Sequence, residues 1–264
     1  MAERIDFPPE ELKRLYVDEG WSPAQIAERF NCRPATILAR LRDYGIPLRP
    51  RGWHKLVRHV PDAILNSWPS PELAYIVGLV ASDGNLEEDN NCVILNTTDF
   101  ELADTFRQLL GMNNAHIVVV NHAPPRKTSY MVQVCDYVFR SFVEARGLTP
   151  RKTLTIGALD VPDQVFVDFL RGELDGDGGW HIGHGWRGVE YLIAKIVSKS
   201  RPYLEWIQKT VERLTGLTGR FSGHGVVYNG HNAERLGAWL YYSPDLPCLS
   251  RKRERWAQWM CSKQ

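Results

Sequence analysis

Two short segments of the 264-residue sequence repeat one pattern, ninety-four residues apart. Residues 76–84 read IVGLVASDG and residues 170–178 read LRGELDGDG, so each is a helix-forming stretch that ends on an Asp-Gly pair. The chain thereby offers two carboxylates, Asp83 and Asp177, in equivalent structural places. Such acids can share a divalent cation that activates water for attack on a phosphodiester. A single Asp-Gly pair is usually a plain turn, whereas a matched pair predicts a metal-dependent nuclease.

The two helices are expected to pack on each other beside these aspartates. Small residues four positions apart share one helical face and let two backbones approach closely. The sequence has Gly78 and Ser82 in the first helix, and Gly172 and Gly176 in the second. Gly84 and Gly178 follow and are expected to be left-handed C-caps.

Close packing of these helix ends brings like charges together. Helix C-termini carry partial negative charge, so a carboxylate on each end needs a compensating cation. Mg²⁺ is the expected occupant, because it takes oxygen ligands, keeps several waters and bridges to phosphate oxygens.

The elements around the two segments also repeat. The hydrophobic pattern predicts a helix, a strand, a helix, a hairpin and a helix in each half, which indicates a duplicated fold with pseudo-two-fold symmetry. The first half is expected to use residues 71–82, 92–96, 99–110, 117–134 and 137–146, and the second 163–175, 189–199, 202–215, 219–229 and 233–242. Each half then ends on a similar run, residues 148–152 and 249–252.

The N-terminal residues predict a separate three-helix module. The first helix opens at Pro9 and is expected to turn Leu12, Leu15, Tyr16 and Val17 to one side. Ser22 and Gln25 form a capping box for the second helix. The third, 34–44, would be the recognition helix of a helix-turn-helix DNA reader, followed by an extended basic tail. The expected DNA contacts are Arg33, Thr36, Arg40, Arg49 and Arg51; the alternative is a bundle that binds another protein.

Composition limits the possible classes. The net charge is +1, yet eight Lys/Arg face one acid between Arg29 and Val60, which indicates a polyanionic partner. Five cysteines, an odd number without Cys-x-x-Cys spacing, argue against a disulfide framework and a zinc site and favour a reducing compartment. Since neither a membrane-spanning run nor a secretory start is seen, we expect a soluble, intracellular protein, cytoplasmic or nucleoid-associated, with an organelle or phage origin left open.

The paired segments resemble the LAGLIDADG homing endonucleases in their single-chain, two-motif form, over roughly residues 71–264. The resemblance implies an α+β fold, a duplicated αββαββα core with saddle-shaped antiparallel sheets. It makes Asp83 and Asp177 the metal ligands and catalytic acids, and Lys152 and Lys252 the basic residues near the site, with phosphate contact as their alternative role. The segments depart from the family pattern at Ala81, Arg171 and Glu173, and the last two are expected on exposed sides of the helix.

The resemblance also predicts that the sheets read DNA. One face of the strand 189–199 would pack and the other would meet the duplex. The expected DNA contacts of the core are Arg126, Lys127, His181, Arg187, Lys195, Lys199, Arg220 and Arg251, with His181 and Arg187 in a glycine-broken loop. The predicted domains are a helix-turn-helix at 1–52, a linker at 53–70, and half-domains at 71–157 and 158–264.

The leading hypothesis is a monomeric, Mg²⁺-dependent endonuclease that cuts each strand of a long DNA site once, with Ca²⁺ supporting binding without cleavage. Two alternatives stay open: a non-cutting transcription regulator, and a maturase that binds intron RNA. A self-splicing intein is disfavoured, because the chain starts with Met and lacks a His-Asn ending.

Overall fold

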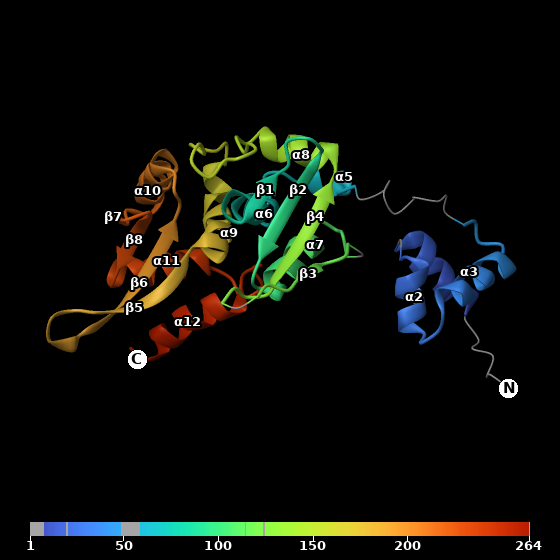
Figure 1. Ribbon diagram of the computed structural model, residues 1–264. Coiled ribbons are helices and arrows are strands. Elements are labelled where there is room, and N and C mark those ends of the chain that lie inside the picture. The colour runs from blue at the N-terminus through green and yellow to red at the C-terminus, as the bar shows by residue number, and fades with distance from the viewer. Residues whose placement is uncertain (1–7, 20, 49–58, 114, 124, 264) are drawn as a thin grey trace. The chain divides into compact units, whose positions relative to one another are not determined.

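The computed structural model describes residues 8–19, 21–48, 59–113, 115–123 and 125–263 (Figure 1). Internal contacts divide the chain into two units, Met1–Arg58 and His59–Gln264. The finer domain boundaries expected from the sequence remain predictions. Within the described residues, no helix combines the length and the apolar character needed to cross a membrane.

The smaller unit is a helical bundle around its own core. Helix α1 (Pro9–Lys13) runs into a π-helical turn (Arg14–Asp18), followed by α2 (Pro23–Arg29) and α3 (Pro34–Asp43). The predicted capping box of α2 is present, with the Gln25 amide 3.2 Å from Ser22 Oγ. Leu12, Leu15 and Tyr16 are buried, but Val17 is 52% exposed, so its expected place on the inner side is wrong.

The first half of the larger unit builds one antiparallel sheet. The elements are α5 (Asp62–Leu65), α6 (Pro71–Ser82), β1 (Gly84–Leu86), β2 (Cys92–Thr97), α7 (Phe100–Leu109), β3 (Val118–Val120), β4 (Ser129–Cys135) and α8 (Tyr137–Glu144). The sheet order is β1-β2-β4-β3. The short strand β1 directly follows the Asp-Gly pair and lay outside the predicted strands.

The second half repeats this arrangement. A 3₁₀ turn (Asp163–Val165) leads into α9 (Phe166–Asp177), and the other elements are β5 (Gly179–His184), a second 3₁₀ turn (Trp186–Gly188), β6 (Glu190–Val197), α10 (Arg201–Thr215), β7 (Arg220–Ser222), β8 (Gly225–Asn229), α11 (His231–Leu240) and α12 (Ser250–Cys261). The sheet order β5-β6-β8-β7 matches that of the first half. The predicted duplicated α+β core is therefore confirmed, while α12 is an addition.

One predicted loop is a strand. His181 and His184 belong to β5, where His181 pairs with Ile193 and His184 with Glu190 of β6. Only Arg187 lies in the turn between the two strands, with a positive φ of 59°. The expected alternation of β6 is confirmed, since Leu192, Ala194 and Ile196 are buried and the residues between them are partly exposed.

Helices α6 and α9 form the seam between the halves, with one sheet on each side of the pair (Figure 1). A Cβ on Gly78 would lie 2.1 Å from the carbonyl oxygen of Phe169, and one on Gly172 would lie 2.2 Å from that of Tyr75. Only glycine permits this approach. The predicted contact of small residues is confirmed.

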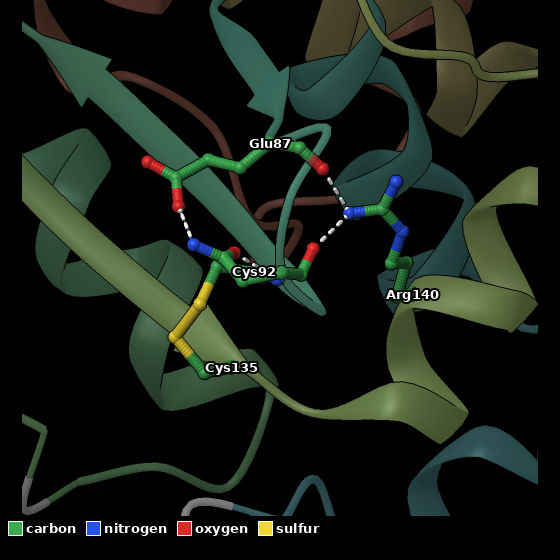
Figure 2. Close-up of a disulfide and its surroundings, with 5 residues drawn as sticks. Glu87, Cys92, Cys135 and Arg140 are labelled. Atoms are coloured by element: carbon green, nitrogen blue, oxygen red, sulfur yellow. Dashed lines mark hydrogen bonds between the residues drawn. A yellow bond between two sulfur atoms is a disulfide. The ribbon is translucent and has the colours of Figure 1, made fainter.

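The cysteines correct another expectation. Cys92 of β2 and Cys135 of β4 lie directly opposite each other and form a disulfide (Figure 2). Cys32, Cys248 and Cys261 are free. An odd number of cysteines excluded complete pairing, but it did not exclude one cross-strand bond.

Candidate metal and nucleic-acid site

The two helices of the seam deliver their aspartates to one place. Asp83 caps the C-terminus of α6, and Asp177 is the last residue of α9. The glycines that follow are not left-handed, since Gly178 has φ −100° and Gly84 is absent from the positive-φ residues, so the expected cap type is wrong. Glycine is required there for another reason. A Cβ would lie 2.6 Å from the Val80 Cα in one half and 2.7 Å from the Leu174 Cα in the other.

The surroundings disfavour negative charge on both acids. Burial, followed by repulsion from Asp177, raises the pKa of Asp83 to about 7, against the opposing effects of Lys252 and Lys152. Burial likewise raises the pKa of Asp177, and the same two lysines oppose that shift. The four predicted catalytic residues therefore lie within electrostatic reach of one another.

The two lysines hold the ends of the two helices. The Lys252 ammonium lies 2.7 Å from the Leu174 carbonyl oxygen, 2.6 Å from that of Asp175 and 2.8 Å from that of Gly178. The Lys152 ammonium donates to the Gly84 carbonyl. Both side chains are buried, which lowers the pKa of each. They thus supply the positive charge that helix C-termini favour.

A groove of 460 Å³ opens beside Asp83. Three of the predicted DNA-contacting residues, Arg126, Lys127 and Arg251, line it. The sequence analysis missed the polar residues that share this lining: Asn96, Thr97, Thr98, Asp99, His122 and Ser129. They follow the ends of β2 and β3 or begin β4, positions that only the strand pairing brings together.

Arg251 is already paired in this groove. Its Nη2 lies 2.7 Å from Asp99 Oδ2 and its Nε 2.8 Å from Asp99 Oδ1, so α12 of the second half is tied to the start of α7 in the first. This pair lowers the pKa of Asp99, chiefly through its hydrogen bond.

The other predicted DNA-contacting residues lie on separate surfaces. Lys195 is on the outward face of β6, Lys199 follows that strand, Arg220 begins β7 and Arg187 is at the β5–β6 turn. In the smaller unit, Arg33 is the exposed N-cap of α3, and Thr36 and Arg40 are partly buried on that helix, with Arg40 3.3 Å from Asp43. Arg49 and Arg51 lie outside the described residues.

Charged residues of the second segment are buried, which corrects their expected exposure. Arg171 is 0% and Glu173 1% exposed, because α6, β6 and α11 all pack on α9. Arg171 pairs with buried Asp168 at 2.7 Å. Burial raises the pKa of Glu173 to about 8, although the Tyr203 hydroxyl donates to it at 2.9 Å.

The buried acid Asp175 is only partly satisfied. Its Oδ2 accepts from the Tyr75 hydroxyl at 2.9 Å and from the Leu249 amide at 2.8 Å, while Oδ1 has no partner among the described residues. Burial raises its pKa to about 6.

The donor set at the seam suits a cation that takes few protein ligands. Among the described residues, no three His, Cys, Asp or Glu side chains converge on one point. Asp83 and Asp177 are hard oxygen donors whose negative charges are disfavoured by their surroundings. Mg²⁺ is commonly held by one or two carboxylates plus waters and phosphate oxygens, so the residues fit it.

Comparison with known proteins gives distant similarities, and no family model matches the chain. An A-type ATP synthase protein of Methanopyrus kandleri is 26% identical over 168 residues, or 64% of this chain, but the match spans only 16% of that protein. The LAGLIDADG meganuclease I-AabMI, solved bound to uncleaved DNA, is 11% identical with a TM-score of 0.49, covering 74% of this chain and 92% of that one. Full-length WhiA from Thermatoga maritima is 12% identical with a TM-score of 0.46, covering 76% and 64%. The element order, the two equivalent sheets and the paired Asp-Gly helices together give the chain the two-motif LAGLIDADG fold that its sequence predicted.

Proposed function

We propose that the chain is a divalent-metal-dependent endonuclease that cuts both strands of a specific DNA duplex. The observation that carries this proposal is the pair of aspartates at matching helix ends, whose negative charges are disfavoured by burial and, for Asp83, by its partner. Perturbed acids that converge beside a basic groove are typical of functional sites. In a folded chain without ligand such acids cost stability, which argues for a ligand that offsets the cost.

Each residue of the site has a distinct role in this proposal. Asp83 and Asp177 would hold the metal, which when bound supplies Lewis-acid activation of water and stabilisation of the leaving oxygen. Lys152 and Lys252 keep the helix ends, and with them the two carboxylates, in place. Arg126, Lys127 and Arg251 orient the phosphodiester backbone in the groove beside Asp83.

Mg²⁺ is the cation that we propose, with Ca²⁺ supporting binding alone. We further propose that the chain acts as a monomer, because its two halves already supply both aspartates. The smaller unit would add DNA contacts through α3 as a helix-turn-helix. Intron RNA is a further candidate partner that binding assays would test.

A second candidate function is a non-cutting DNA-binding regulator. The lysine ammonium groups favour it, because they neutralise part of the charge on both aspartates without any metal. A regulator would bind one sequence and would not require either carboxylate.

Cleavage of a randomised duplex library separates these functions. Wild-type protein, Asp83→Asn and Asp177→Asn would be incubated with Mg²⁺ and the cut ends sequenced, with exposed Asp245→Asn as the control. The endonuclease predicts one long cut site that is lost or only nicked in the two variants, while Ca²⁺-supported binding persists. Sequence-specific binding without any cutting by wild type would establish the regulator instead.

A further inference from the structure

His181 lies on the outward face of β5, close to the end of α9. The strand alternates, so Trp180 is 2% exposed while His181 is exposed. The His181 Nε2 is 3.6 Å from the point where a Cβ on Gly179 would lie, so the ring leans back along the strand toward its start. Gly179 is the second residue after Asp177. The imidazole is thus directed toward the helix end that carries this carboxylate.

Three cations surround this imidazole. Lys195 of β6 is paired opposite Gly179, and Lys252 and Arg255 come from α12, which packs against β5 (Figure 1). Burial, then Arg255, Lys195 and Lys252, lower the pKa of His181. The ring is therefore neutral at pH 7 and available as a proton acceptor.

The first half has no such group in the corresponding place. Glu87 stands ninety-four residues before His181, just after β1, and its carboxylate is held by the Asn90 side chain of the β1–β2 turn (Figure 2). Arg140 donates to the Glu87 and Asn90 carbonyl oxygens and fixes that turn. The chemical environments on the two sides of the seam therefore differ.

We propose that His181 is the proton acceptor for hydrolysis of the DNA strand whose phosphate lies at Asp177, and that the other strand is cut without it. This inference rests on the proposed endonuclease function. A water oxygen forms a bond to phosphorus while one of its protons passes to Nε2 of His181. The phosphorus–oxygen ester bond breaks with its electron pair on the leaving sugar oxygen, which takes a proton from solvent.

Strand-resolved cleavage kinetics test the proposal. His181→Gln is compared with His184→Gln, a matched change on the same strand that lies on its opposite face and pairs with Glu190 at 3.7 Å. Each strand of the target carries its own fluorophore, and DNA affinity is measured without divalent metal. Because general bases contribute 10²–10⁴-fold, His181→Gln should slow one strand by about 100-fold and leave affinity and the other strand within about twofold. The acid limb in the pH profile of that strand should disappear, and His184→Gln should behave as wild type.

Other outcomes overturn the inference in distinguishable ways. Equal slowing of both strands, or weaker binding in proportion to the slower rate, would make His181 a phosphate contact. Unchanged rates would remove it from the reaction. A wild-type protein that cuts neither strand would overturn the proposed function and this inference with it.

NMR of the metal-free protein gives a readout independent of cleavage. The imidazole carbon-bound protons of His181 should titrate below the usual histidine range, and Arg255→Gln should move that titration upward. An unchanged titration in Arg255→Gln would contradict the placement of His181 among these cations.

Discussion

The ammonium nitrogen of Lys252 lies 2.8 Å from the carbonyl oxygen of Gly178, the residue that follows Asp177. Together with its contacts to Leu174 and Asp175, this makes Lys252 the cap of helix α9. Replacing Lys252 by Met would leave buried carbonyl groups without a donor at a negative helix end.

Lys252→Met should therefore lower the free energy of unfolding by about 3 kcal/mol. Urea denaturation measures the change, and exposed Lys209→Met on α10 serves as the control, with an expected effect within about 0.5 kcal/mol. If both variants are equally stable, Lys252 does not hold the helix end.

Stability in metal-free buffer should fall as pH rises. The folded pKa of Asp83 is about 7 and that of Glu173 about 8, above ordinary values of 3.8 and 4.5. Because the folded state binds these protons more tightly, their stabilisation is complete below about pH 4 and is lost as pH passes 7 to 8. Thermal unfolding with a chelator should show the decline, and Asp83→Asn should flatten its part near pH 7. A wild-type melting temperature that rises from pH 5 to 8 would contradict the assignment.

Mg²⁺ should stabilise the DNA-free protein in a pH-dependent manner. A cation that binds only the folded state raises stability by mass action, and protons compete for Asp83 below its pKa of about 7. The rise in melting temperature should thus be larger at pH 8 than at pH 5. Differential scanning fluorimetry measures it, and Asp83→Asn should abolish the difference. An equal rise in that variant would place the cation elsewhere.

Gly172→Ala should disrupt the seam. Its added Cβ would lie 2.2 Å from the Tyr75 carbonyl oxygen, so the helices must separate, at a cost of about 3 kcal/mol or more. Gly157→Ala is the matched control, since nothing lies within 4 Å of its Cβ. Alanine favours an isolated helix by about 1 kcal/mol over glycine, so a stabilised Gly172→Ala variant would show that the backbones do not touch.

Reduction of the Cys92–Cys135 bond should destabilise the first half. The bond closes a loop across 43 residues of sequence separation, for which chain entropy predicts about 4 kcal/mol at most. Alkylation followed by intact-mass measurement, with and without reductant, counts the free thiols. Five alkylated cysteines before reduction would show that the bond is absent, and Cys248→Ser should not alter the stability difference.

The sequence predicted what depends on local pattern. The small residues at 78 and 172 indicated a helix seam, and the Asp-Gly pairs indicated two equivalent acids, because close packing and helix ends have strong local signatures. Strand β5 was missed because Gly179, Gly183 and Gly185 read as a loop. Its pairing with β6 over six residue pairs is tertiary and outweighs that propensity.

Burial of charge could not be read from one helix. Arg171 and Glu173 appeared to face solvent, since charged residues rarely lie inside a core. Their partners, Asp168 at 2.7 Å and Tyr203 at 2.9 Å, come from the same helix and from α10 respectively. The position of Lys252 under α9 likewise depends on α12, a helix that the sequence did not predict. Choosing a cysteine pair also required the register of β2 and β4, which no spacing rule supplies.

The backbone contact at Gly78 and Gly172 determines how a duplex must adapt. Side chains that interdigitate can change rotamer and let helices slide, but two backbones in contact have no such freedom. Spreading the two sheets would require breaking the seam itself. In the proposed complex the protein is therefore the stiff partner and the DNA must bend to it, so sequences that bend or unstack easily would be preferred even at base pairs that no side chain touches.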